Sequence, residues 1–434
     1  MNIALLAGTH SGCGKTSVTL ALLQAIQRAG LSVASFKTGP DFLDPLWHQA
    51  VTGKASYNVD TQMVGLADSL RQLHNATADY ALIEGVMGLF DGRTGVGESG
   101  SSLDLARVLG APVLLVVDVG GMSGSVVPLV QGFCQSAKAK GVTITGIIAN
   151  RVGSAYHAEL IRNFLEEYEQ PPLVAWMEKN APVLPGRHLG LIMPEASDVP
   201  DFSAAFHVDF DLIAWGELSE PQQLSSSERE CWGSFLTPTY GGLLQGKRIA
   251  IARDAACCFL YPANVDWLRA EGAELVFFSP LAGDAIPDGS DALWLAGGYP
   301  ELHTEQLSQS ATWVSLRAFI EAGNPVLAEC GGMMLLGQEL IDIEGRARAM
   351  AGIMPFSVRM QARLVSLGYR ESAAGVRGHE FHYSERFADE TLASCFELER
   401  GDTGLYYKNL LASYIHWYFP SNPETVAQWF LKAC

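Results

Sequence analysis

A glycine-rich loop near the N-terminus constrains the fold of this chain more than any other feature. Residues 8–16 read Gly-Thr-His-Ser-Gly-Cys-Gly-Lys-Thr and directly follow an apolar run at residues 3–7. In a phosphate-binding loop, glycines let backbone N–H groups approach a phosphate, while a lysine adds charge and a hydroxyl reaches Mg²⁺. The loop is lengthened, because five residues separate Gly8 from Gly14 where the common loop has about four. We therefore expect a strand, a loop and a helix beginning near Ser17, with ATP contacts from Gly8, Ser11, Gly12, Cys13, Gly14, Lys15 and Thr16.

Short apolar runs alternate with helix-length segments through the rest of the first half. They lie at residues 33–36, 80–83, 113–117 and 144–149. Continuous apolar strands separated by helices are typical of a parallel sheet that helices cover on both faces. The sequence predicts a doubly wound α/β domain over residues 1–200.

Polar residues follow each of these predicted strands. Lys37 and Asp41 come after the second run, Glu84 after the third, Asp118 after the fourth and Asn150 after the fifth. Ligands of open parallel sheets bind at the carboxyl ends of the strands. We therefore expect these side chains to gather at one edge of the sheet.

The residue types at that edge suit a site for ATP and Mg²⁺. We expect Lys37 to contact the nucleotide, and carboxylates to hold Mg²⁺ or orient a substrate. Asp and Pro also favour turns for local reasons, so Asp41, Asp44 and the Asp91-Gly92 pair have a purely structural alternative. The predicted metal ligands are Thr16, Asp41 and Glu84, and the predicted substrate contacts are Asp44 and Asp91.

Asn150 has two interpretations. Its amide can donate and accept hydrogen bonds together, which suits recognition of a nucleotide base. The alternative is an Asn that caps the following helix. We expect the base contact.

The pattern weakens after residue 200 into an acidic stretch rich in Ser and Pro, which is typical of a boundary between domains. We assign residues 201–246 to a linker and 247–434 to a second domain. Further apolar runs at residues 247–252, 275–278, 292–295 and 325–328 predict another α/β fold.

Cys330 lies in this second domain within the sequence Ala-Glu-Cys-Gly-Gly, after a predicted strand and before a helix predicted within residues 331–340. Such an elbow exposes a side chain at a helix N-terminus, where the thiolate form is favoured. A buried inert cysteine is the alternative. We expect Cys330 to be a nucleophile.

A thiol nucleophile needs a base, and three downstream histidines are candidates. We choose His416, which follows a short apolar strand, over His379 and His382. Position 418 is Tyr, so an orienting acid two residues after the base is missing. Backbone N–H groups of Gly298 and Gly331 are the predicted oxyanion hole, although a glycine-rich turn after a strand can also be structural.

Composition limits the partners. A formal net charge of −18 argues against a general nucleic-acid binder, which needs clustered cations. No apolar run reaches the roughly 18 residues of a membrane span. Eight cysteines without a regular spacing fit a reducing cytoplasm. The sequence leaves the oligomeric state undecided, and a homodimer is compatible with it.

At this point the chain resembles the cobyrinic acid a,c-diamide synthase family over essentially its whole length. The lengthened phosphate loop is similar to that of dethiobiotin synthetase, and the second domain is similar to a class I glutamine amidotransferase domain that lacks the acid after its histidine. The resemblance implies that ATP and Mg²⁺ drive amidation of the a and c acetate groups of a corrin-ring polycarboxylic acid, with glutamine supplying nitrogen through an acyl phosphate. The stretches that carry it are residues 8–16, 37–45, 84–92, 297–301, 329–333, 378–383 and 414–416.

Several alternatives share this architecture. They are a cobyric acid synthase, a nickel-sirohydrochlorin a,c-diamide synthase and cytidine triphosphate synthase, whose histidine is usually followed by Pro-Glu instead of the Trp417-Tyr418 found here. A non-enzymatic alternative is a nucleotide switch with an inactive amidotransferase domain. The Cys330 and His416 pair argues against the switch.

Overall fold

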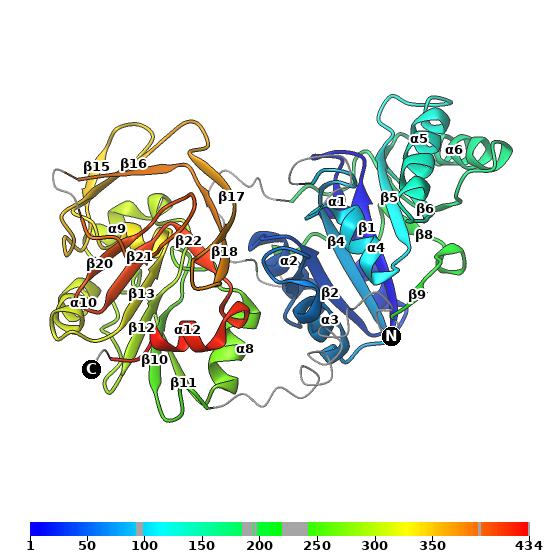
Figure 1. The fold of residues 1–434 in the computed structure, drawn as a ribbon. Coiled ribbons are helices and arrows are strands. Elements are labelled where there is room, and N and C mark those ends of the chain that lie inside the picture. The colour runs from blue at the N-terminus through cyan, green and yellow to red at the C-terminus, as the bar shows by residue number, and fades with distance from the viewer. Residues whose placement is uncertain (93–98, 185–193, 195–197, 219–241, 389–391, 433–434) are drawn as a thin grey trace. The chain divides into compact units, whose positions relative to one another are not determined.

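The computed structural model describes residues 1–92, 99–184, 194, 198–218, 242–388 and 392–432. These residues divide into two compact units, the first including the described residues up to Leu218 and the second those from Gly242 onward. Figure 1 shows a central sheet with surrounding helices in each unit. Within the described residues, no helix has both the length and the apolar character needed to cross a membrane.

The described part of the first unit is built on one nine-stranded sheet. Its strand order is β3-β2-β4-β1-β5-β6-β7-β8. The ninth strand, β9, lies outside this order and pairs with β1. The strands from β3 to β7 run parallel, whereas β8 and β9 are antiparallel to their neighbours. The strands are β1 (Asn2–Gly8), β2 (Val33–Thr38), β3 (Tyr57–Val59), β4 (Tyr80–Gly88), β5 (Val113–Asp118), β6 (Ile144–Val152), β7 (Leu173–Glu178), β8 (Phe206–Val208) and β9 (Gly216–Glu217).

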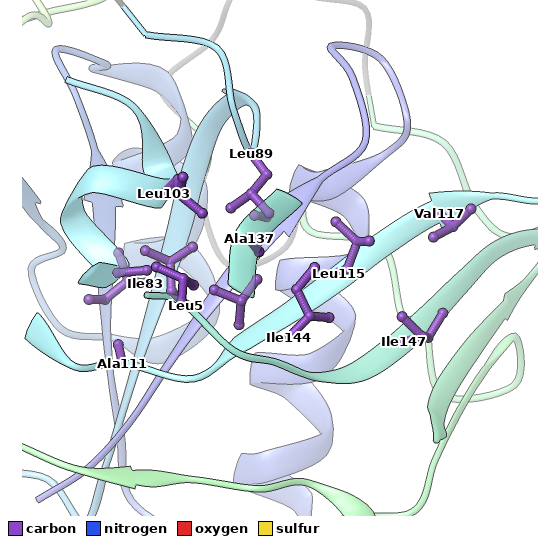
Figure 2. Close-up of a cluster of buried hydrophobic side chains, with 14 of the residues drawn as sticks. Leu5, Ile83, Leu89, Leu103, Ala111, Leu115, Val117, Ala137, Ile144 and Ile147 are labelled. Atoms are coloured by element: carbon purple, nitrogen blue, oxygen red, sulfur yellow. The ribbon is translucent and has the colours of Figure 1, made fainter. Parts of the chain in front are cut away.

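Apolar side chains of these strands alternate between two buried layers, because successive strand residues point to opposite faces. Leu5, Ile83 and Leu115 pack with α3, α4, α5 and α6 on one face, and Figure 2 shows part of this cluster with Leu103 of α4 and Ala137 of α5. The other face packs against α1 and α2. The helices are α1 (Lys15–Arg28), α2 (Leu43–Thr52), α3 (Leu66–Asn75), α4 (Ser102–Leu109), α5 (Val126–Ala139), α6 (Ala155–Glu167) and the short η2 (Phe210–Leu212).

The described part of the second unit has a mostly parallel sheet of order β11-β10-β12-β13-β21-β20, in which only β20 is antiparallel to its neighbour. Two small sheets complete it, one of order β15-β14-β16-β19 and one of order β17-β18-β22. The strands are β10 (Arg248–Ala252), β11 (Glu274–Phe278), β12 (Ala292–Leu295), β13 (Val326–Glu329), β14 (Glu339–Ile341), β15 (Ala347–Ala349), β16 (Ser357–Met360), β17 (Ser366–Glu371), β18 (Arg377–His382), β19 (Ser384–Phe387), β20 (Leu405–Tyr407), β21 (Leu410–Ser413) and β22 (Ile415–Trp417).

Helices again cover both faces of the main sheet. Trp267 of α8 and Val426 of α12 pack on one face, while Leu316 and Ile320 of α10 pack on the other. The helices are α8 (Pro262–Ala270), η3 (Pro300–Leu302), α9 (Thr304–Ser308), α10 (Thr312–Glu321), α11 (Gly331–Met334), η4 (Phe419–Ser421) and α12 (Pro423–Gln428). The predicted α/β fold class is confirmed in both units.

Two segments differ from the expectation. Residues 206–208 and 216–217, expected in the linker, form β8 and β9 of the first sheet, where they cover strand edges that would otherwise be unpaired. The predicted linker residues 219–241 lie outside the described residues. The helix expected within residues 331–340 ends at Met334, and Glu339 begins β14 because this segment pairs with β15 and β16.

Candidate active sites

The loop after β1 has the backbone of a phosphate cradle. Gly12 and Gly14 have φ values of +85° and +92°, a region that glycine enters without strain. A Cβ on Gly8 would lie 2.4 Å from Sγ of Cys13, so the loop closes tightly over its first residue. Lys15 begins α1 at the sheet edge, and Ser11 is exposed. The loop thus offers backbone N–H groups, a helix N-terminus and a cation together.

Lys37 is the centre of a buried charged cluster behind this loop. Its Nζ lies 2.7 Å from Asp44 Oδ2, 3.2 Å from Glu84 Oε1 and 3.9 Å from Asp41 Oδ2. Burial alone would lower the pKa of Lys37, but Asp44, Glu84 and Asp41 outweigh burial and raise it. By contrast, burial lowers the pKa of Lys15, and the nearby Lys37 charge acts in the same direction. Lys37 therefore carries a fixed positive charge at the site.

Three oxygen groups meet at the start of α1. The Thr16 hydroxyl lies 2.9 Å from Glu84 Oε1 and 3.2 Å from Asp44 Oδ1. A hydroxyl and one or two carboxylates, completed by phosphates and water, are the ligands that Mg²⁺ prefers, so these residues fit the expected ion. The described residues contain no group of three His, Cys, Asp or Glu side chains poised for a metal, and a phosphate-bound Mg²⁺ needs none.

Asp41 and Asp91 bond to the local backbone. Asp41 Oδ1 accepts from the N–H groups of Leu43 and Asp44 at the start of α2, at 2.8 and 3.1 Å. Asp91 is exposed and accepts from Gly88 N–H at 2.8 Å. Both carboxylates stabilise turns at the sheet edge, and their metal and substrate roles stay predictions.

Asn150 supports the phosphate loop through hydrogen bonds of its side-chain amide. Its Nδ2 donates to Cys13 O at 2.8 Å, and its Oδ1 accepts from Arg151 N–H at 2.8 Å. A Cβ on Gly14 would lie 2.0 Å from that same Nδ2. Because both ends of the amide already bond to the protein, the observed role is structural, and the predicted base contact stays a prediction.

His48 is a functional candidate that the sequence reasoning missed. This fully buried residue of α2 has its Nε2 2.7 Å from Glu84 Oε2. It follows Asp44 by four residues, so both side chains lie on one face of α2. That Asp-to-His spacing after the second strand was the available signal.

In the second unit, Cys330 occupies a strained elbow between β13 and α11. Its φ is +44° and its ψ is −109°, although it is not glycine. Its backbone N–H donates to Ser413 O at 2.7 Å, which ties the elbow to β21. Such strain at a strand-to-helix junction is typical of a nucleophile held in a fixed orientation.

Neighbouring contacts connect Cys330 with the other predicted residues. Glu329 Oε1 accepts from Trp417 N–H at 2.8 Å, which joins the residue before Cys330 to the residue after His416. A Cβ on Gly297 would lie 2.2 Å from Cε1 of His416, and a Cβ on Gly331 would lie 2.9 Å from Gly298 N. The elbow, the imidazole and the two glycines predicted for the oxyanion hole therefore belong to one compact cluster.

His416 comes after the short apolar strand β21, as expected, and itself lies within β22. It pairs with His379 of β18, and the two rings stack with centroids 4.9 Å apart. Burial, together with His379 and His382, lowers the pKa of His416 well below its usual value. The imidazole is therefore neutral near pH 7, as a general base must be. His382 instead bonds to Glu380 Oε1 at 2.9 Å.

The thiol itself differs from the expectation of a stabilised thiolate. Burial raises the pKa of Cys330, and the nearby carboxylate of Glu301 adds to the effect. The helix that follows has only four residues, so its dipole offers little compensation. In the ligand-free protein the pair is thus neutral thiol and neutral imidazole.

This state predicts slow alkylation of Cys330 by iodoacetamide near neutral pH. Because the thiolate is the reactive form and the folded pKa is raised, the rate should keep rising above about pH 9. Mass spectrometry of the Cys330 peptide measures the rate across pH, with glutathione as the reference thiol. A rate that is already constant below about pH 7 would contradict the neutral pair.

A phosphate-loop α/β unit and an α/β unit with a cysteine elbow, joined in one chain, place the protein among enzymes that combine a nucleotide-binding domain with a glutamine amidotransferase domain. Residues 4–204 match the CobQ/CobB/MinD/ParA nucleotide binding domain, and residues 248–424 match the CobB/CobQ-like glutamine amidotransferase domain. The chain belongs to the cobyrinate a,c-diamide synthase family, so the predicted family is confirmed. It is a carbon–nitrogen ligase with a glutamine amidotransferase domain.

The similarity to curated relatives spans both units. The chain is 41% identical to the cobyrinate a,c-diamide synthase of Herminiimonas arsenicoxydans over 442 residues, covering 99% of this chain and 96% of the relative. It is 42% identical to the hydrogenobyrinate a,c-diamide synthase of Stutzerimonas stutzeri over 440 residues, covering 98% and 97%.

Proposed function

We propose that the protein uses ATP and glutamine to amidate the a and c carboxylates of cobyrinic or hydrogenobyrinic acid. The observation that carries this proposal is the full-length similarity to enzymes named for these two substrates. The first unit would activate each carboxylate, and the second would release ammonia from glutamine.

In the first unit, a substrate carboxylate oxygen attacks the γ-phosphorus of ATP, and the bond to ADP breaks to leave an acyl phosphate. Ammonia then adds to the acyl carbon, loses a proton and displaces inorganic phosphate. Lys15 and Lys37 hold positive charge where phosphate charge develops, which stabilises both steps.

Mg²⁺ would neutralise charge on the β- and γ-phosphates. Thr16 and Glu84 would hold it with Asp41 as predicted, and Asp44 is a further candidate because it also reaches Thr16. Asp44 and Asp91 are the proposed substrate contacts. Ser11, Gly12, Cys13 and Gly14 present the loop to the phosphates.

In the second unit, His416 takes the thiol proton as Cys330 Sγ attacks the amide carbon of glutamine. The N–H groups of Gly298 and Gly331 would stabilise the oxyanion. Return of the proton from His416 expels ammonia and leaves a thioester, which water hydrolyses to glutamate and free thiol. The neutral imidazole and the strained elbow support these assignments.

The proposal predicts two amides per substrate molecule. Purified protein would be incubated with ATP, Mg²⁺, glutamine and, separately, cobyrinic acid, hydrogenobyrinic acid or nickel-sirohydrochlorin, and amides counted by mass spectrometry. Amidation of neither corrin acid, or of nickel-sirohydrochlorin alone, would overturn the proposal. Amides at other carboxylates would indicate a cobyric acid synthase instead.

A further inference from the structure

The two oxygens of Glu84 have separate partners. Oε1 receives the Thr16 hydroxyl at 2.9 Å and Lys37 Nζ at 3.2 Å, whereas Oε2 lies 2.7 Å from His48 Nε2. Glu84 and His48 are both fully buried. One oxygen of Glu84 therefore faces the proposed metal position, and the other faces α2.

Two buried contacts hold the His48 imidazole, one at each ring nitrogen. Behind the ring, Ser56 Oγ lies 3.0 Å from His48 Nδ1 and 3.0 Å from Ser35 O. Nε2 faces a carboxylate that already accepts from Lys37, and it donates there. The chain of bonds holds the imidazole by both ends.

We propose that His48 is a positioning residue that restricts Glu84 to binding the metal through one oxygen, and that this restriction favours Mg²⁺ over Ca²⁺. A cation bound through both oxygens of Glu84 would have to share Oε2 with the N–H of His48, which weakens that hydrogen bond and disfavours bidentate binding. Mg²⁺ demands a tight octahedron and keeps several waters, whereas Ca²⁺ takes six to eight oxygens and accepts bidentate carboxylates. The inference rests on the proposed metal site at Thr16 and Glu84.

The test measures binding of a fluorescent, non-hydrolysable ATP analogue to the full chain in EDTA, in Mg²⁺ and in Ca²⁺. In His48→Leu the tightening by Mg²⁺ should fall by about 10- to 100-fold, the usual effect of losing a partner behind a metal ligand. The preference for Mg²⁺ over Ca²⁺ should shrink as well. Binding in EDTA should match the unaltered protein.

Two amide variants separate positioning from packing. The amide of His48→Gln can reach the place of Nε2 and donate to Glu84, whereas that of His48→Asn reaches only the place of Nδ1 near Ser56. The Gln variant should keep most of the Mg²⁺ effect, and the Asn variant should lose it. Comparison of the Gln and Asn variants therefore tests the role of His48 even if His48→Leu fails to fold.

Unchanged Mg²⁺ tightening and an unchanged Mg²⁺ to Ca²⁺ ratio in the Leu and Asn variants would overturn the inference. Glu84→Gln tests the underlying assignment separately. If Glu84→Gln also leaves the Mg²⁺ effect intact, the proposed metal site itself is wrong. If only Glu84→Gln abolishes the effect, the metal site stands and the role of His48 fails.

Discussion

Replacing Cys330 by Ala is expected to abolish amidation supported by glutamine while leaving amidation supported by an ammonium salt. The alanine removes the sulfur atom that would form the proposed thioester, and loss of a nucleophile should cost at least about 10³-fold. Ammonia supplied from solution bypasses that step. The proposed ATP-dependent chemistry would depend on Lys15 and Lys37, which lie in the other unit.

Amide formation is measured by mass with each nitrogen donor at saturating concentration. Cys395→Ala is a matched control, because Cys395 is also a free cysteine of the second unit and has no proposed role. It should retain activity with both donors. An equal loss with glutamine and with ammonium in a folded Cys330→Ala protein would contradict separate sites.

The features that the sequence predicts best are those set by local patterns. The parallel strands follow from runs such as residues 113–117, which are apolar because helices cover both faces of the sheet. The phosphate loop follows from glycines whose positive φ values are a local requirement. Lys37 and Glu84 could be placed at one edge because parallel strands end together.

Side-chain partners could not be predicted in the same way, because tertiary packing chooses them. In the sequence, His48 looks like an ordinary helix residue, but α2 packs against β2 and brings His48 to Glu84 of β4. Asn150 was expected after a strand, but it lies within β6 near its carboxyl end, and its amide bonds to Cys13 O of the loop. In the sequence, Glu329 is recognisable only as a member of the cysteine motif. In the structure, its carboxylate accepts hydrogen bonds from Trp417 N–H and Trp294 Nε1.

The acidity of Cys330 depends on the balance between two effects that only the structure sets. A helix N-terminus lowers a thiol pKa, whereas burial and a nearby carboxylate raise it. Here α11 is one turn long, and Cys330 is buried beside Glu301, so burial dominates. In the proposed mechanism, proton transfer to His416 is then coupled to attack on glutamine.

Replacing Lys15 by Ala is expected to abolish amidation with glutamine and with ammonium alike. Lys15 lies at the first position of α1, mostly buried, where its charge and the helix N-terminus act on the same phosphates. Lys37 cannot replace it, because its ammonium group is already paired with Asp44 and Glu84. We expect a fall of at least about 10²-fold in ATP-dependent turnover, since positioned charge supplies most of the catalysis in phosphoryl transfer.

The half-reactions make this prediction specific to one unit. Lys15→Ala should still hydrolyse glutamine to glutamate in the absence of ATP, because Cys330 and His416 belong to the other unit. Lys140→Ala, at the exposed end of α5, is the matched control and should keep every activity. Retained ATP-dependent amidation in Lys15→Ala would remove the phosphate-loop assignment. Loss of glutamine hydrolysis in the same folded variant would mean instead that the phosphate loop influences the thiol site even without nucleotide.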